Sequence, residues 1–355
     1  MRIVGGLILA MVVAATQADA AEAGELSLAR IYGAPDLSGP TLRGAQFSPD
    51  GRRVTYLKAR ADDIDVYDLW ELDTASGRHR LLVDSRRLAP VEQPLSAEEQ
   101  ARRERQRIAA LRGIVEYQWA PHGRGLLFPL DGDLYYYDLR ARPESATRRL
   151  TDTESFETDA KFSPGGRYVS FIRDQDLYVL ELASGRERAL TTDGEGPVSN
   201  GVAEFIAQEE MDRQTGYWWS PDERRIAVTR VDESPVPEVE RFEVYATEFK
   251  VYRQRYPAAG TANALVSLAV IDVESGERRT VDLGPDTDIY LARVDWFPEG
   301  DRLLVQRQSR DQKTLDLLAC PADGGEPRRL FSETDDTWVD LHDDLRFVEG
   351  RRQFV

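Results

Sequence analysis

The sequence predicts an all-β protein, a β-propeller of four-stranded blades with short helical insertions. Three observations predict it: an aromatic-proline motif recurs five times, a strand-like run follows every copy, and a second hairpin follows several of them. Repetition of one supersecondary unit along a chain is typical of propellers and solenoids. A β-sandwich with chance Ser-Pro turns is the alternative, but sandwiches do not repeat in this way.

The first twenty residues are predicted to be a secretory signal peptide. Met1-Arg2 forms a short basic start, and residues 3–15 are almost wholly apolar or glycine but too few to span a bilayer. Ala18-Asp19-Ala20 supplies the small residues of a cleavage site. We therefore expect an exported mature chain that begins at residue 21 and has no stable membrane anchor. An uncleaved N-terminal anchor is the alternative.

The recurring motif consists of an aromatic residue, one further residue and a proline. A polar turn follows the proline, and the fifth and seventh residues after it are always apolar or aromatic. This spacing has period two, as in a strand with one buried face. Proline cannot donate a hydrogen bond to a sheet, so it belongs at the mouth of the strand. The five copies are Phe47-Ser48-Pro49, Trp119-Ala120-Pro121, Phe162-Ser163-Pro164, Trp219-Ser220-Pro221 and Trp296-Phe297-Pro298.

A second hairpin completes the predicted blade. Strand-like runs at residues 133–139, 176–186 and 268–277 supply it, and two of these runs end in Ser-Gly. Residues 347–355 match residues 297–305, so a sixth unit is predicted to open at the end of the chain. We therefore expect an incomplete ring of five to six blades at residues 21–355, in a fragment of a longer protein.

Two segments do not fit the repeat and are predicted to be helical. Ser96 and Glu99 have the spacing of a capping box, and residues 97–112 contain neither glycine nor proline. This predicted helix carries five arginines, of which Arg103 and Arg107 lie four apart and share a face. A charged helix that faces only solvent would show the same pattern, so this alternative stays open.

The second helical segment, residues 200–211, ends in two adjacent glutamates. Val202, Phe205 and Ile206 form an apolar stripe at helical spacing, and Glu209 and Glu210 follow it. Two carboxylates at a helix end can share the three donors of a protonated amine. An adjacent glutamate pair is also common on solvent-exposed protein surfaces, so the pair alone does not establish a binding site.

Composition excludes several classes of partner. The 355 residues include 63 Asp and Glu against 46 Lys and Arg, a formal net charge of −17, whereas a nucleic-acid partner needs a basic surface. Cys320 is the single cysteine and can form no internal disulfide. The sequence has no metal-ligand cluster, phosphate loop or dinucleotide fingerprint, so we expect neither metal nor cofactor.

Several stretches resemble the N-terminal propeller domain of the dipeptidyl peptidase IV family of serine exopeptidases, in particular an exported bacterial member. The similarity runs from about residue 40 to the end of the chain and is most specific in residues 198–263. It departs from the family at Ala264, where proline commonly follows the asparagine, and the propeller of this family is expected to have eight blades. The stretches that carry it are Asn200-Gly201-Val202 through Gln208-Glu209-Glu210, Tyr217-Trp218-Trp219-Ser220-Pro221-Asp222, Asp232-Glu233-Ser234-Pro235-Val236-Pro237, residues 256–263 and residues 337–347.

The resemblance implies roles for four residues. Glu209 and Glu210 would bind the free N-terminal ammonium of a peptide substrate. An arginine from an upstream insertion would bind the carbonyl of the second residue, and in this sequence Arg107 is the first choice and Arg103 the next. Such a site measures two residues from the amino terminus, so the parent enzyme would remove dipeptides, with Pro or Ala expected at the second position. The family also implies a periplasmic or secreted location and a possible homodimer of the full-length form.

The catalytic machinery is expected outside this chain. No Gly-x-Ser-x-Gly occurs, so His79, His122 and His342 have no nucleophile-elbow serine to serve. The resemblance implies a C-terminal α/β-hydrolase domain with a Ser-Asp-His triad, absent from these 355 residues, and the chain alone is expected to be inactive. Two alternatives remain: a non-enzymatic periplasmic binding propeller, or another prolyl oligopeptidase branch that lacks the glutamate pair.

Overall fold

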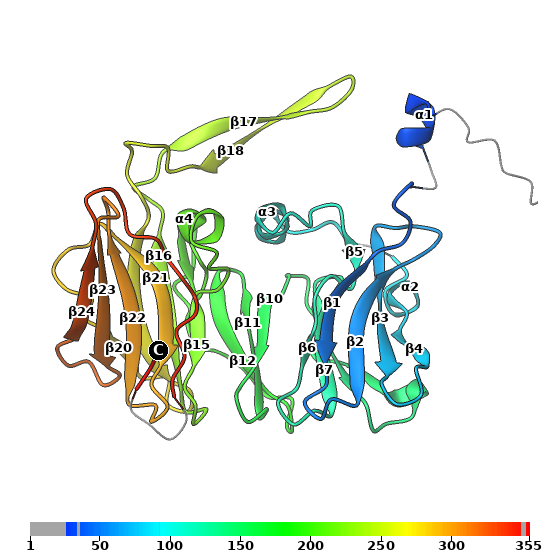
Figure 1. The fold of residues 1–355 in the computed structure, drawn as a ribbon, viewed down its shortest axis with the longest axis horizontal. Coiled ribbons are helices and arrows are strands. Elements are labelled where there is room, and N and C mark those ends of the chain that lie inside the picture. Colours follow the sequence, from blue (N-terminus) through cyan, green and yellow to red (C-terminus); the bar gives the residue numbers. More distant parts are fainter. Residues whose placement is uncertain (1–25, 34–35, 92, 349–352) are drawn as a thin grey trace, which may run out of the picture.

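The computed structural model describes residues 26–33, 36–91, 93–348 and 353–355. Within them, five sheets made mainly of antiparallel strands stand next to one another as propeller blades (Figure 1). The predicted signal peptide, residues 1–20, lies outside the described residues. No helix in the described part of the chain is long and apolar enough to cross a membrane.

Each copy of the repeated motif closes the first strand of one blade, so the predicted propeller is confirmed. Blades 2, 3 and 5 have four strands paired in chain order. Blade 1 has four such strands and a short fifth strand, β5 (Arg112–Gly113), that pairs with β3 in parallel, whereas blade 4 has a first strand in two pieces. Blade 1 contains β1 (Leu42–Phe47), β2 (Arg53–Ala59), β3 (Val66–Asp73) and β4 (His79–Val83). Blade 2 contains β6 (Gln118–Trp119), β7 (Gly125–Leu130), β8 (Asp133–Asp138) and β9 (Thr147–Arg149).

The remaining blades follow the same plan. Blade 3 contains β10 (Thr158–Phe162), β11 (Tyr168–Arg173), β12 (Asp176–Glu181) and β13 (Glu187–Ala189). Blade 4 contains β14 (Val198–Asn200), β15 (Tyr217–Trp219), β16 (Arg225–Asp232), β19 (Leu265–Asp272) and β20 (Arg278–Thr280). Blade 5 contains β21 (Ile289–Trp296), β22 (Arg302–Ser309), β23 (Thr314–Pro321) and β24 (Arg328–Thr334). The short elements are α1 (Leu28–Ile31), α2 (Ser85–Leu88), β5 (Arg112–Gly113) and the 3-10 helix η1 (Pro143–Ser145).

The hydrophobic core lies between neighbouring blades rather than inside any one of them. Leu69 of blade 1 packs with Leu126 and Phe128 of blade 2, and all three are almost fully buried. The same contact recurs between blades 4 and 5 through Ala227 and Leu303. All six residues of β11 are buried, because blade 3 is covered on both faces. Each blade is therefore stabilised by its neighbours.

In blades 1, 3 and 4 a serine and an acid close the turn after the proline. In blade 1, the Ser48 hydroxyl donates to Asp50 at 2.7 Å and accepts from the Arg53 amide at 3.0 Å. Blade 3 has Gly165 at the position of Asp50, and Glu223 from the turn of blade 4 supplies the missing carboxylate. It accepts hydrogen bonds from the Ser163 hydroxyl and, at 2.7 Å, from the Gly165 amide. Blades 3 and 4 are therefore joined by a charged hydrogen-bonded contact.

Replacing Glu223 with glutamine is expected to lower the free energy of unfolding by about 1–2 kcal/mol, because the turn of blade 3 loses its charged acceptor. Urea denaturation measures this loss. The double variant with Gly165→Asp is the control, since it returns the acid to the place it has in blade 1. Recovery of stability supports the contact between blades, whereas an unchanged midpoint in the single variant contradicts it.

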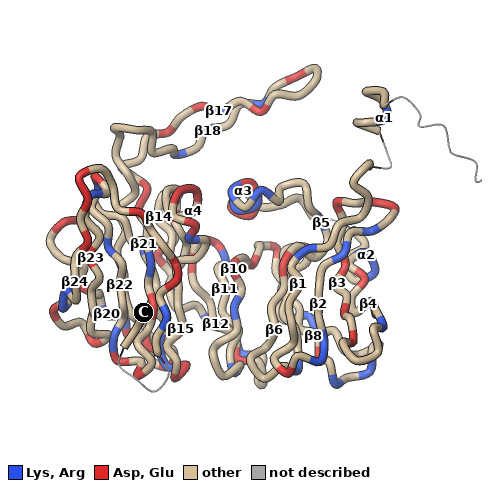
Figure 2. The backbone as a smooth tube through the Cα atoms, viewed as in Figure 1, with Lys and Arg blue, Asp and Glu red and all other residues tan. Residues whose placement is uncertain are grey.

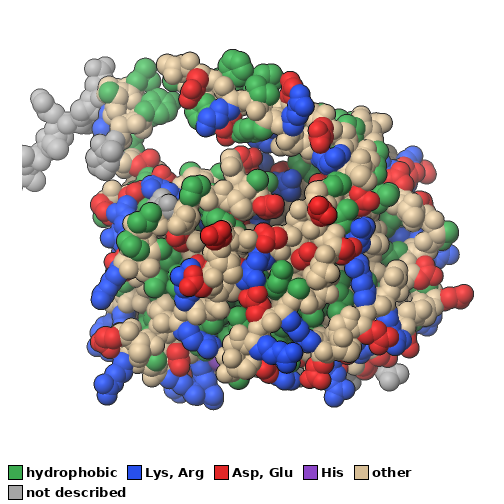
Figure 3. All heavy atoms as spheres, turned by 180° about the vertical axis from the view of Figure 1, so that it is seen from behind, with side chains coloured by type: hydrophobic (Ala, Val, Ile, Leu, Met, Phe, Trp, Pro, Cys, Tyr) green, Lys and Arg blue, Asp and Glu red, His purple; other side chains and the backbone are tan. Residues whose placement is uncertain are grey.

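Three insertions gather at one end of the propeller (Figure 1). Helix α3 (Ala97–Arg105) lies between β4 and β5, and α4 (Phe205–Glu209) lies between β14 and β15. The hairpin β17 (Glu238–Val244) and β18 (Phe249–Arg255) joins β16 to β19 and stands clear of the blades. Exposed hydrophobic side chains lie along the hairpin (Figure 3). Its Arg241 contacts Glu104 of α3 at 3.4 Å, so the hairpin and α3 meet above the blades.

Both predicted helices are shorter than expected. Helix α3 begins as predicted, with the Ser96 hydroxyl accepting from the Glu99 amide at 3.2 Å, but it ends at Arg105 rather than at residue 112. Arg107 adopts a left-handed conformation with φ 57°, and the Ile108 amide donates to the Arg103 carbonyl at 2.8 Å. This is a Schellman ending without its usual glycine, secured by the burial of Ile108. The second segment is helical only over α4, because Asn200 belongs to strand β14.

The end of the described chain packs against blade 5. Phe347 and Phe354 form an isolated antiparallel bridge, and the ring of Phe347 lies 5.1 Å from that of Phe297. A sixth blade therefore stays a prediction, and residues 349–352 of that segment lie outside the described residues.

Candidate functional site

A cavity of about 760 Å³ opens where the three insertions meet the ends of blades 3 and 4. Helices α3 and α4 stand on opposite sides of it, and the base of the hairpin contributes Glu238 and Arg255. Helix α3 carries both acidic and basic residues (Figure 2). Acids outnumber bases in the wall: Glu98, Glu154, Asp159, Asp174, Glu204, Glu233 and Glu238 against Arg102, Arg105, Arg253 and Arg255. Such a wall favours a cationic ligand.

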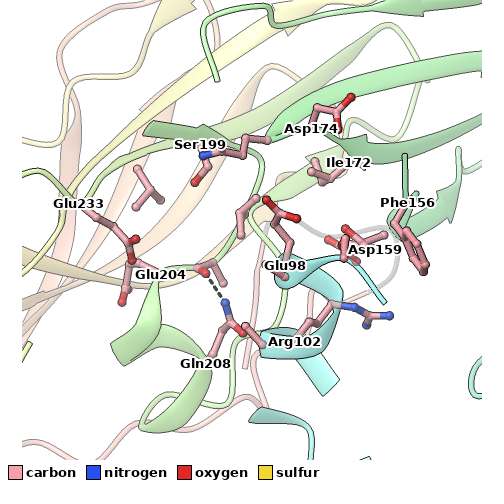
Figure 4. A pocket seen from close by; sticks show the side chains of 18 of the residues that line it. Glu98, Arg102, Phe156, Asp159, Ile172, Asp174, Ser199, Glu204, Gln208 and Glu233 are labelled. Atoms are coloured by element: carbon pink, nitrogen blue, oxygen red, sulfur yellow. Dashed lines mark hydrogen bonds between the residues drawn. The ribbon is translucent and has the colours of Figure 1, made fainter. Parts of the chain in front are cut away.

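Helix α4 is held firmly by buried polar contacts. Glu204 caps its first turn by accepting from the Ala207 amide at 2.9 Å, and Arg213 lies 3.6 Å from the same carboxylate. Arg213 in turn donates to the carbonyl of Leu291 in blade 5 at 3.1 Å. The Gln208 side chain donates to the Ala203 carbonyl, and Figure 4 shows it on the cavity side of α4. The end of α4 is therefore fixed relative to blades 4 and 5.

Glu209 and Glu210 lie at this fixed end. Glu209 is the last residue of α4, and Glu210 caps the helix by donating its amide to the Ile206 carbonyl at 2.9 Å. Both side chains are exposed, and neither forms an ion pair within 4.0 Å in the described part of the chain. They are not among the residues that line the cavity, so they stand beside it rather than inside. Two carboxylates on a fixed backbone are thus available to a ligand.

Arg105 is the basic residue of α3 that faces these acids. Its guanidinium lies 5.2 Å from the ring centroid of Phe205, the first residue of α4. Burial lowers the pKa of Arg105, and the nearby carboxylates of Glu233, Glu209 and Glu204 oppose this shift. Arg105 forms no ion pair within 4.0 Å in the described part of the chain, so its donors remain available to a ligand.

The two arginines chosen from the sequence lie elsewhere. Arg103 is buried and donates to Glu99 at 2.6 Å and to the Leu111 carbonyl at 2.9 Å. Arg107 follows the end of α3, is exposed, and does not line the cavity. Glu209 is thus among the carboxylates near Arg105, whereas Arg103 is engaged with Glu99 and Arg107 lies outside the lining of the cavity.

The sequence indicates part of this assignment of the arginines of α3. Glu99 precedes Arg103 by four residues, which is the spacing of a helical ion pair and indicates a structural partner for Arg103. Arg102 and Arg105, three apart, both line the cavity. The contact between Arg105 and Phe205 spans one hundred residues, and no local pattern predicts it.

The blades and the cavity between their insertions define a propeller domain with a ligand-sized pocket at one end. Residues 111–355 match the family described as the dipeptidyl peptidase IV (DPP IV) N-terminal region. The chain therefore belongs to this family, and the resemblance inferred from the sequence is confirmed. The matched range begins after α3, so Arg105 lies outside it.

Curated relatives carry related names. The chain is 29% identical to dipeptidyl peptidase 8 of Mus musculus over 304 residues, which cover 70% of this chain and 34% of that protein. It is 31% identical to the probable dipeptidyl-aminopeptidase B of Emericella nidulans over 209 residues, covering 53% of this chain and 23% of that protein. The chain thus spans about a third or less of the length of these relatives.

Solved structures share the fold. Dipeptidyl peptidase 4 of Porphyromonas gingivalis matches with a TM-score of 0.67 and 24% identity, over 87% of this chain and 42% of that one. A putative dipeptidyl aminopeptidase IV from Bacteroides ovatus matches with a TM-score of 0.58 and 19% identity, over 86% and 40%. At these identities the likeness establishes the propeller fold and not the ligand.

Proposed function

We propose that the cavity between α3 and α4 receives the free amino terminus of a peptide, and that this propeller selects substrates for an exported dipeptidyl peptidase. The observation that carries the proposal is the position of Glu209, whose unpaired carboxylate lies near the unpaired guanidinium of Arg105 at the edge of an acidic cavity. The names of the relatives support the activity, since they are peptidases that act on dipeptide units.

The glutamate pair suits a protonated amine. An ammonium group has three donors, and two adjacent carboxylates on one fixed turn can accept them together. The fixed end of α4 limits the cost of ordering these side chains when the ligand binds. A neutral, acylated amino terminus offers one donor and no charge, so the pair discriminates against it.

Arg105 is the arginine that we propose for the peptide carbonyl. Its guanidinium is held against Phe205, and its donors point to no protein acceptor within ion-pair distance in the described residues. Arg107 and Arg103 remain the predictions made from the sequence, and a test must separate the three. An amine at Glu209 and Glu210 together with a carbonyl at Arg105 would fix the first two residues of the peptide.

Hydrolysis itself would come from outside these 355 residues. The sequence contains no Gly-x-Ser-x-Gly, and a Ser-Asp-His hydrolase domain would supply the nucleophile in the longer protein. The preference for Pro or Ala at the second position, the periplasmic or secreted location and homodimerisation of the longer protein belong to the same proposal and stay predictions.

Calorimetric titration of the purified chain tests the proposal with two peptides, Ala-Pro-Ala-amide and its N-acetylated form. We expect the free amine to bind at least about ten-fold more tightly, because only it carries the charge that the glutamates accept. Arg105→Ala and Arg107→Ala are compared under the same conditions. A larger loss of affinity at Arg105 supports the assignment made from the geometry, and a larger loss at Arg107 supports the one made from the sequence.

Equal affinity for the free and acetylated peptides would contradict the proposal. That outcome would instead favour an endopeptidase or acylaminoacyl peptidase branch of the superfamily, in which the amino terminus is not read. A binding propeller without enzymatic function would show no loss of affinity when Glu209 and Glu210 are replaced.

A further inference from the structure

Glu233 is a third carboxylate at this end of the cavity, and the backbone holds it in place. It follows β16, and its amide donates to the Pro197 carbonyl at 2.9 Å while its carbonyl accepts from the Val236 amide at 2.9 Å. Val236 is buried and anchors the turn. The side chain lines the cavity, and Figure 4 shows it beside Glu204.

The carboxylate of Glu233 is half-buried and unpaired. It forms no ion pair within 4.0 Å in the described part of the chain. Three charged groups face it: Arg105 from α3, Glu204 from α4 and Arg255 from β18. Glu204 already caps α4, and Arg255 already contacts Glu238 at 3.4 Å and the Val236 carbonyl at 2.8 Å. Glu233 and Arg105 are therefore the two opposite charges at this end of the cavity that have no close partner.

We propose that Glu233 is a further binding residue, which faces the bound amine together with Glu209 and Glu210 and makes binding depend on pH. This inference rests on the proposed function and extends it. Glu204 is already paired with Arg213, so Arg105 faces two further carboxylates, Glu209 and Glu233, and this end of the cavity favours an added cation. A peptide ammonium supplies that cation.

The direction of the pH dependence follows from the surroundings of Glu233. Burial raises the pKa of Glu233 and the nearby Glu204 raises it further, whereas Arg105 and Arg255 lower it. As the pH falls, the carboxylate of Glu233 therefore takes up its proton at a higher pH than an ordinary glutamate, whose pKa is 4.5. Affinity for the protonated amine falls over the same pH range, because the protonated carboxyl group carries no negative charge. Above about pH 8 the peptide amine loses its own proton, so affinity falls on that side also.

The raised pKa of Glu233 affects stability in the opposite direction to binding: lowering the pH weakens binding but favours the folded state. A carboxyl group whose pKa is raised by folding favours the folded state at low pH, and this contribution is lost as the pH rises through the raised value. At neutral pH the charge on Glu233 therefore costs stability. Glu233→Gln is expected to leave the melting temperature unchanged or to raise it, which a structural carboxylate would not do.

Titration of the full chain with Ala-Pro-Ala-amide from pH 5 to pH 9 tests the inference. Glu233→Gln is expected to weaken binding about ten-fold at pH 7 and to move the acidic limb of the affinity curve to lower pH. Glu233→Asp should retain part of both properties. The control is Glu144→Gln, which removes one exposed carboxylate of η1 that does not line the cavity. The N-acetylated peptide should show no acidic limb.

The outcomes separate the inference from the proposed function. Amine-dependent binding with the same pH curve in the wild type and in Glu233→Gln would overturn the inference and leave the proposed function intact. No preference of the wild type for the free amine at any pH would overturn both. A melting temperature of Glu233→Gln well below that of Glu144→Gln would assign Glu233 a structural role and overturn the inference.

Discussion

Replacing Glu209 and Glu210 together with glutamine is expected to abolish the preference of the chain for peptides with a free amino terminus. The two side chains are exposed and form no ion pair in the described residues, so both carboxylates are available to a peptide amine at the fixed end of α4. In the longer protein, each single substitution by alanine is expected to lower kcat/KM by roughly 30- to 1,000-fold, the scale for removing one partner of a desolvated ion pair.

The neighbouring Asp212 offers a matched control. It is also exposed and acidic, and its φ of 51° is a left-handed conformation that asparagine tolerates. Asp212→Asn should bind the free-amine peptide as the wild type does. Loss of binding in this variant, or retention of binding when Glu209 and Glu210 are both glutamine, would show that general charge and not the pair attracts the peptide.

Removing the side chain of Arg173 is expected to cause the largest loss of stability, about 3–5 kcal/mol in the free energy of unfolding. Arg173 is buried in blade 3, where it contacts Glu157 at 2.6 Å and Glu187 at 2.5 Å. The side chain of Glu157 is fully buried, so Arg173→Ala leaves an uncompensated charge in the core. Urea denaturation at neutral pH measures the effect.

The pH dependence of this loss is itself a check. Burial already raises the pKa of Glu157, and Arg173 is one of the groups that lower it, so the variant raises that pKa further. Because a raised carboxyl pKa favours the folded state at low pH, the destabilisation of Arg173→Ala should shrink as the pH falls. The double variant Arg173→Met with Glu157→Gln should recover most of the stability, since no buried charge remains.

Arg167 provides the comparison for Arg173 within the same blade. It also pairs with a glutamate, Glu181, at 2.9 Å, but more than half of its side chain is exposed. Its replacement by alanine should change the unfolding midpoint far less, because exposed pairs are screened by solvent. Equal losses at Arg167 and Arg173 would mean that burial of the Glu157 pair does not determine the effect.

The propeller was predictable because its chemistry repeats. Every copy of the aromatic-proline motif ends one strand, and residues at period two enter the core between blades, as Leu126 and Phe128 do. The start of α3 was predictable for a local reason as well, since Ser96 and Glu99 are only three residues apart.

The end of α3 and the arginine of the site were not predictable from local patterns. The helix stops because the buried Ile108 draws the chain back and Arg107 accepts a left-handed conformation that usually requires glycine. Arg105 acquires its surroundings from α4 and from the turn after β16, which are about one hundred and more residues distant. Such a site depends on how insertions from different blades meet, and this depends on the packing of the whole arc.

The contact of Glu223 in blade 4 with the turn of blade 3 has a consequence for the order in which the blades fold. Glu223 accepts the amide of Gly165 across a separation of 58 residues. During synthesis the third blade leaves the ribosome before that carboxylate exists, so its turn is completed only when the next repeat has emerged. Blade 3 therefore completes its folding only after the first strand of blade 4 and the turn that follows it have been synthesised.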